Sequence, residues 1–130
     1  GNENEKAAKF FEHNEQIERQ LADAGWRPGQ LVAGIKKDVI ISSHIADRPD
    51  RVVIYGWHRH DGSPIQPVYS GHIWWYVDYS HGIRFMNAQV LVDGSPVKVS
   101  DLLKDPVLFR IVTDEENPLR LSFYPENMIL

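Results

Sequence analysis

The sequence predicts an α+β fold, with an N-terminal amphipathic helix packed on a mainly antiparallel sheet of about five strands and short helices near the C-terminus. Apolar positions recur at helical spacing before residue 25, and short segments rich in β-branched and aromatic residues follow. Two Asp-Gly-Ser-Pro tetrapeptides mark turns between extended segments. The chain has 130 residues, 42% of them hydrophobic and 25% charged, which predicts one domain over residues 1–130.

The first predicted element is a helix from about Glu3 to Ala24. Its apolar positions step by three and four residues, as one face of a helix does. Gly25 follows as a C-terminal stop, and residues 27–29 turn the chain away. We therefore assign residues 1–25 to the helix and residues 30–124 to the core that contains the sheet. The predicted stripe consists of Ala7, Phe10, the polar exception Asn14, Ile17, Leu21 and Ala24.

The later segments alternate between predicted strands and turns. Glycine accepts positive φ without steric cost, so Asp61–Pro64 and Asp93–Pro96 are expected to form hairpin turns. Ser100 is expected to cap a short helix, and the Asp105-Pro106 pair to begin another turn. Strands are predicted within residues 31–43, 51–58, 72–79, 83–92 and 119–124.

Composition excludes several classes of function. A net charge of −4 argues against nucleic-acid binding, which depends on a basic face. The absence of cysteine removes thiol catalysis and disulfides. No apolar run approaches the roughly 20 residues that cross a bilayer, so no membrane span is expected. The polar residues 1–6 carry no apolar targeting segment, and we expect no signal peptide in this chain.

Residues 55–84 concentrate the groups that can carry chemistry, including four of the six histidines. The chain must turn near Ser80, and this turn can bring His81 back toward Asp78. A carboxylate that orients an imidazole is a common unit of hydrolases, and it is also a common structural hydrogen bond. Arg84 can bind an anionic group or form a surface ion pair. His81 is thus the candidate general base and Asp78 its orienting group.

His72, Trp74, Tyr76 and Asp78 share one face if residues 72–79 form a straight strand. Such a strand places His72 roughly 20 Å from Asp78. The two side chains can then act together only if a bend intervenes. His72 is a candidate polar contact for a substrate.

His58 and His60 are two residues apart and share a strand face, at a separation of roughly 6.6 Å. They can hold zinc or another divalent metal if a third ligand comes from elsewhere. The alternative is that His58 is a hydrogen-bonded strand residue and His60 caps the adjacent hairpin. His58 is also a candidate catalytic residue without metal.

Lysine and aromatic side chains suggest further contacts to a substrate. Strand alternation puts Lys36 on one face and Lys37 on the other, so that one reaches a cleft and the other is solvated. Lys36 is the candidate for binding an anion, with a surface charge run as the alternative. Exposed Trp57, Trp74 and Tyr76 can stack on sugar rings or other flat ligands, although aromatic residues in strands are more often core.

Three motifs resemble those of an uncharacterised family of bacterial, often exported proteins. They are Gly34-Ile35-Lys36-Lys37-Asp38-Val39, Tyr55-Gly56-Trp57-His58 and Asp78-Tyr79-Ser80-His81-Gly82-Ile83-Arg84. The resemblance covers most of residues 30–115 and implies an extracytoplasmic location, without implying an activity. Position 35 is commonly histidine in that family, so Ile35 implies an altered or inactive member if that histidine takes part in chemistry.

Two classes of function remain open on the sequence. The first is a hydrolase acting on a polar cell-envelope or nutrient substrate through His81, Asp78 and His58, with Lys36 and Arg84 binding its anionic group. The second is a noncatalytic module that binds a carbohydrate or another ligand by Trp and Tyr stacking, and the same aromatic face also suits a protein partner. The expected partner is a small molecule, a glycan or a peptide.

Overall fold

The computed structural model describes residues 2–30, 34–59, 61–82 and 85–125, and it has the predicted α+β fold. One long helix, two antiparallel sheets and several short helices follow one another along the chain. The helical elements are η1 (Glu3–Glu5), α1 (Ala7–Asp23), α2 (His44–Asp47), α3 (Val99–Leu102) and η2 (Leu108–Ile111). The strands are β1 (Lys37–Val39), β2 (Val52–His58), β3 (Pro64–His72), β4 (Gln89–Val92) and β5 (Ser95–Lys98).

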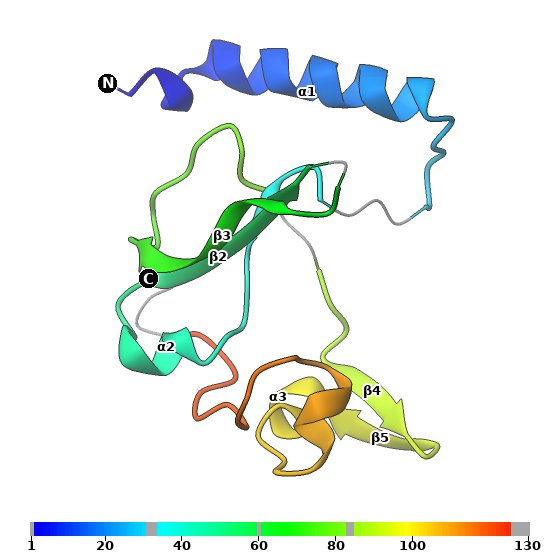
Figure 1. The fold of residues 1–130 in the computed structure, drawn as a ribbon, viewed down its shortest axis with the longest axis vertical. Helices are drawn as coiled ribbons and strands as arrows, with labels where there is room; N and C mark the ends of the chain where they lie inside the picture. Colours follow the sequence, from blue (N-terminus) through cyan, green and yellow to red (C-terminus); the bar gives the residue numbers. More distant parts are fainter. Residues whose placement is uncertain (1, 31–33, 60, 83–84, 126–130) are drawn as a thin grey trace.

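These elements are stacked in three tiers (Figure 1). Helix α1 lies across one end, the sheet that contains β2 and β3 occupies the middle, and β4, β5 and α3 form a separate unit at the other end. The five strands divide into a three-stranded sheet of order β1-β2-β3 and a two-stranded sheet of β4 and β5. Among the described helices, none is long and apolar enough to cross a membrane.

The middle strand β2 departs from regular geometry at several positions. Its pairing with β3 shifts register twice, between Val52 and Ile54 and again between Ile54 and Gly56. Gly56 has a φ of 124° and Trp57 a φ of 53°. Positive φ is uncommon for a bulky residue such as tryptophan, so this break is held in place by its surroundings. The Trp57 N–H donates to the backbone carbonyl of Lys36 at 3.1 Å and thereby fixes the break against β1.

Both Asp-Gly turns form as predicted. Gly62 has a φ of 84° in the connection between β2 and β3, where Asp61 accepts from the Ser63 N–H at 2.9 Å. Asp93 and Gly94 have φ values of 50° and 81°, so both central residues of the β4–β5 turn are left-handed. This is the geometry of the type I′ hairpin turn that Asp-Gly favours.

The core lies in two parts joined by the C-terminal segment. Ile45, Val53 and Ile54 are buried beside the three-stranded sheet. The second part lies in the unit that contains β4, β5 and α3, which we call the end unit. Its buried residues are Leu102, Leu103, Phe109 and Leu119. The Tyr124 hydroxyl accepts from the Val53 N–H at 2.9 Å and donates to the Ile40 carbonyl at 2.7 Å. The C-terminal segment is thereby tied to both β1 and β2.

Helix α1 ends as the sequence predicts, but its buried face differs. Gly25 has a φ of 71°, its N–H donates to Ala22 and the Trp26 N–H donates to the Leu21 carbonyl, which together form a Schellman cap. The buried residues of α1 are His13 and Ile17. His13 lies outside the predicted apolar stripe, and it is buried because Trp57 and Tyr79 pack against its ring.

The strand predicted at residues 72–79 is absent, and β3 occupies the preceding segment. Only His72 of the predicted range belongs to a strand, and Ile73 and Tyr76 close a turn by a hydrogen bond of 3.1 Å. Pro64 and Pro67 obscured β3 in the sequence. Both are tolerated because β3 is an edge strand, in which a missing N–H need not break a ladder.

Two C-terminal predictions are also wrong. The short helix α3 begins at Val99 after Lys98 and has no side-chain cap, so Ser100 lies inside it. Residues 119–124 form no strand, because Leu119 donates to the backbone of Leu103 and Tyr124 uses its hydroxyl in place of a ladder. The predicted single domain over residues 1–130 stays a prediction.

Candidate functional site

The candidate site is organised by β1, which has partners on both sides. β2 pairs with one edge, and residues 80–82 pair with the other. The Lys37 N–H donates to the Ser80 carbonyl at 2.9 Å, and the Gly82 N–H donates to the Lys37 carbonyl at 2.8 Å. Residues 37 and 80–82, which belong to two of the segments that the sequence singled out, are therefore neighbours in space.

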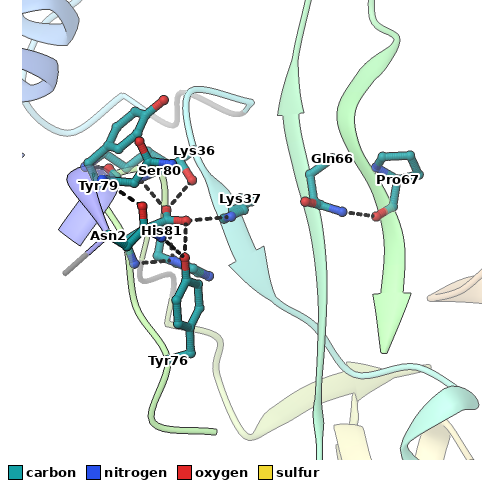
Figure 2. A network of polar contacts seen from close by, with 11 residues as sticks. Asn2, Lys36, Lys37, Gln66, Pro67, Tyr76, Tyr79, Ser80 and His81 are labelled. Carbon is teal, nitrogen blue, oxygen red and sulfur yellow. Dashed lines mark hydrogen bonds and ion pairs between the residues drawn. The ribbon is translucent and has the colours of Figure 1, made fainter. Parts of the chain in front are cut away.

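Asp78 is the centre of a buried polar network. One carboxylate oxygen accepts from the Ser80 N–H at 2.9 Å and from the Ser80 hydroxyl at 2.5 Å. The other accepts from Lys37 Nζ at 3.2 Å and from the Tyr76 hydroxyl at 3.3 Å. Figure 2 shows Lys37, Tyr76, Ser80 and His81 pointing toward one another around this carboxylate. Four donors thus occupy both oxygens of one buried group.

The ionised form of Asp78 is strongly favoured. Burial raises the pKa of its carboxyl, but the hydrogen bonds from Ser80 and the charge of Lys37 outweigh it and lower the pKa from 3.8 to about 2. Both Lys37 and Asp78 expose 9% of their side chains. A carboxylate with this many donors is suited to hold the turn of residues 76–82, and its capacity to accept a further proton at neutral pH is small.

His81 lies beside Asp78, as the sequence predicts. Its Nδ1 is 3.3 Å from the carboxylate and accepts the backbone N–H of Asp78 at 2.9 Å. A neutral imidazole whose Nδ1 accepts carries its proton on Nε2. Burial and the charge of Lys37 lower the pKa of His81, which favours this neutral form. His81 therefore presents an N–H donor, whereas a base oriented by Asp78 would place its proton on Nδ1.

His72 reaches the same network because the chain turns after β3. Its ring centroid lies 5.6 Å from that of His81 and 4.8 Å from that of Tyr76. The straight strand that would separate His72 from Asp78 by roughly 20 Å does not form, and the bend left open by the sequence brings His72 to the Asp78 network. Burial, the charge of Lys37 and the proximity of His81 lower the pKa of His72.

His58 stands on the other side of β1 and makes a separate pair with Tyr55. Residues three apart in a regular strand point to opposite faces. The break at Gly56 and Trp57 brings the two together, and His58 Nε2 lies 3.0 Å from the Tyr55 hydroxyl. Trp57 points instead to α1, where its ring meets His13 at a centroid distance of 5.6 Å.

Two glycines permit close approach around the candidate site. A Cβ built on Gly34 would lie 3.1 Å from Nδ1 of His58, so the histidine packs directly on the glycine backbone. A Cβ on Gly82 would lie 3.0 Å from Oδ1 of Asp38 and 3.0 Å from Cβ of Lys36. All three motifs that carry the family resemblance therefore meet around Lys36 and Asp38.

Lys36 and Asp38 line two grooves. The inter-sheet groove, of about 1190 Å³, lies between β1 and β2 on one side and the end unit on the other. The helix groove, of about 880 Å³, lies between α1, the loop of residues 26–30 and β1. His58 and Tyr55 line the inter-sheet groove, and His81 lines the helix groove.

Lys36 and Lys37 point to different environments, in keeping with strand alternation: Lys37 is buried, and Lys36 is partly exposed where it lines the two grooves. Lys37 is 7% exposed and belongs to the Asp78 network. Nζ of Lys36 donates to Asn14 Oδ1 and to the Tyr79 carbonyl, each at 3.2 Å. Burial lowers the pKa of Lys36. Lys36 thus lines a cleft, as predicted for one of the two lysines, whereas the prediction that the other is solvated is wrong because Lys37 is buried.

The aromatic candidates do not form one surface. Trp74 and Trp75 are 42% and 64% exposed, and their rings meet at an interplanar angle of 87°, so they offer no common flat platform. Tyr76 points into the Asp78 network, and Trp57 packs under α1. None of these four lines the inter-sheet groove or the helix groove.

Three residues near the candidate site are not predicted from the sequence to belong to it. Tyr55 lies in a predicted strand, Ser80 in a predicted turn, and His13 outside the predicted apolar stripe of the helix. Tyr55 and Ser80 stand within the singled-out motifs, so the motifs themselves were the available signal. His13 has no such signal, because it becomes visible only once Trp57 is known to face α1.

Two of the predicted site residues, His60 and Arg84, lie outside the described residues, and the His58–His60 metal pair stays a prediction. Within the described part of the chain, no three His, Cys, Asp or Glu side chains gather in a way that could hold a metal ion.

Comparison of the chain with protein-family models, with curated proteins and with solved structures found no match. The resemblance to an exported bacterial family therefore stays a prediction, and the function must be argued from the geometry.

Proposed function

We propose that this protein binds a small molecule or peptide with an apolar part in the inter-sheet groove. The observation that carries the proposal is a set of exposed apolar side chains within a concave surface. Val39, Ile41 and Val112 line this groove and are 49%, 40% and 44% exposed, and Met86 in its wall is 73% exposed. Apolar surface left open in a cleft is the usual mark of a ligand site.

Polar groups in the same groove can orient such a ligand. The Tyr55–His58 pair lines one wall, and Lys98 lines the side that belongs to β5.

A matched pair of variants tests this proposal with 8-anilinonaphthalene-1-sulfonate, a fluorescent apolar anion, as the probe. Val112 lines the groove, and its neighbour Ile111 is 71% exposed but does not. Val112→Asp should weaken probe binding about tenfold, because it places a charge on the apolar wall. Ile111→Asp makes the same change in net charge and should leave binding unchanged. Equal affinities of the two variants would contradict the proposal.

A second candidate is hydrolysis in the same groove. It is favoured by the convergence of three segments on Lys36 and Asp38, with His58 bordering the groove. Here His58 is the general base, a role that typically contributes 10²- to 10⁴-fold in rate. His81 is the weaker choice because it lines the helix groove and not this one.

Hydrolysis of p-nitrophenyl acetate and p-nitrophenyl butyrate measures this candidate. His58→Gln should lower kcat by about 10²-fold or more, whereas His81→Gln should leave kcat nearly unchanged if the protein stays folded. A larger loss of kcat in His81→Gln than in His58→Gln would favour His81 and Asp78 as the catalytic pair. Equal rates in the parent and both variants would show that neither histidine takes part in the reaction.

A further inference from the structure

We propose that the helix groove is a second binding site, and that its ligand is a neutral saccharide. This groove is lined by residues of α1, the loop of residues 26–30 and β1, and it is distinct from the inter-sheet groove. Its volume of about 880 Å³ falls in the range of known ligand sites. The proposal does not depend on binding or hydrolysis in the inter-sheet groove.

Trp26 supplies the aromatic face that such a ligand needs. It follows the Schellman cap of α1, lines the groove and is 44% exposed. The cap fixes its backbone, because its N–H donates to the Leu21 carbonyl at 2.9 Å. The exposed indole face can stack on the apolar face of a sugar ring. Ile17 and Leu21 of α1 continue the apolar surface beside it.

The polar lining favours a ligand with many hydroxyl groups over an ion. Hydroxyls both donate and accept, so they require neighbours of both kinds. Asn14, Glu18 and Gln30 provide amide and carboxylate groups, and Lys36 and Arg27 provide cationic donors. Two carboxylates, Glu18 and Asp38, balance the two cations, so the described part of the lining carries no formal excess of either sign with His81 neutral.

The environment of Lys36 agrees with this reading. Its Nζ is held by two neutral oxygens, of Asn14 and Tyr79, and it makes no ion pair within the described part of the chain. An ammonium group has three donors, and two of them are used here. The third donor can bind a sugar hydroxyl, and no ion pair of Lys36 within the described residues has to be broken first.

Binding is tested by titrating the full chain with cellohexaose, xylohexaose, maltohexaose and chitohexaose, each to about 10 mM, and recording the indole N–H signals by NMR. The chain has four tryptophans, so four such signals are expected. The Trp26 signal is identified by its loss in Trp26→Phe. At least one of the saccharides should shift this signal and leave the Trp75 signal unchanged. If no saccharide shifts the Trp26 signal, the proposal is overturned.

Two variants separate stacking from a general effect on folding. Trp26→Ala should weaken binding at least about tenfold, and its unfolding curve should stay close to that of the parent because the side chain is 44% exposed. Trp75→Ala, with a side chain that is 64% exposed and outside the groove, is the matched control and should bind as the parent does. Equal loss in both variants would overturn the assignment. Val112→Asp should leave saccharide binding intact, so the two proposals can fail independently.

Discussion

Lys36 and Lys37 are neighbours in the chain at the start of β1, but their side chains make different contacts. Lys37 ends on a buried carboxylate whose two oxygens already receive donors from Ser80 and Tyr76. Lys36 ends on the neutral oxygens of Asn14 and Tyr79 and borders two grooves. The contacts of Lys37 thus form a completed structural unit, whereas Lys36 keeps capacity for a further hydrogen bond. We expect stability to depend on the first and binding on the second.

Replacing each lysine in turn is the most direct test of that contrast. Lys37→Met should lower the free energy of unfolding by about 3–5 kcal/mol, because it leaves the buried Asp78 carboxylate without its cation. Lys36→Met should cost about 1 kcal/mol, since the hydrogen bonds that it loses involve neutral oxygens. Urea denaturation of both variants gives the comparison. Similar losses would mean that the two sides of β1 contribute alike.

The attachment of α1 should be the next largest effect. Ile17 is one of two buried residues of this helix, so Ile17→Ala should lower the free energy of unfolding by about 2–3 kcal/mol. Hydrogen exchange of the α1 amides should accelerate in the same variant. Phe11 lies on the same helix but is 68% exposed, and Phe11→Ala is the control with little expected change. If both substitutions leave the exchange of α1 unchanged, α1 is held by other contacts.

His13 should make this attachment dependent on pH. Its ring is buried, its Nε2 has no hydrogen-bond partner among the described residues, and burial together with the charge of Lys36 lowers its pKa below the ordinary value of 6.5. The unfolded chain then holds the proton more tightly than the folded one. The contribution to stability is complete above pH 6.5 and is lost as the pH falls below it.

Removing the ionisable ring tests the direction of this effect. Between pH 7 and pH 5, the free energy of unfolding should fall less in His13→Phe than in the parent. Part of the pH dependence should remain, because the pKa values of His72 and His81 are also lowered. Denaturation at the two pH values measures the difference. A parent whose stability rises on acidification would refute the assignment.

The smallest effect is expected for a shorter but exposed ion pair. Arg120 lies 2.6 Å from Asp47, closer than Lys37 lies to Asp78, yet the two side chains are 73% and 55% exposed. Water screens such a pair, so Asp47→Asn should change the free energy of unfolding by less than about 1 kcal/mol. A loss as large as that of Lys37→Met would show that distance, and not burial, decides the strength of these pairs.

Local patterns in the sequence predicted much of the fold and only part of the candidate site. The helix end at Gly25 and both Asp-Gly turns depend on neighbouring residues, and they are confirmed. β3 was missed because its prolines suit a strand only at a sheet edge, and edge position is a property of the whole sheet. The aromatic run after His72 has strand-forming composition, yet it turns, and Tyr76 and Asp78 find distant partners in Asn2 and Lys37.

The candidate site shows the same limit. The proximity of Asp78 and His81 could be predicted because three residues separate them, whereas the direction of their hydrogen bond depends on a backbone N–H. That Lys37 is the buried lysine could not be predicted, since its carboxylate lies 41 residues away in the chain. The Tyr55–His58 pair depends on the positive φ of Trp57, which its side chain does not favour.

The bridge made by Tyr124 has a consequence for the order of folding. Its hydroxyl connects residues that lie 71 and 84 positions earlier, next to the point where β1 and β2 separate. Contacts over such distances in sequence form late, because a long loop must first close. During synthesis the three-stranded sheet can therefore pair its strands early. The hydrogen bonds of the Tyr124 hydroxyl to Val53 and Ile40 can form only after Tyr124 has left the ribosome.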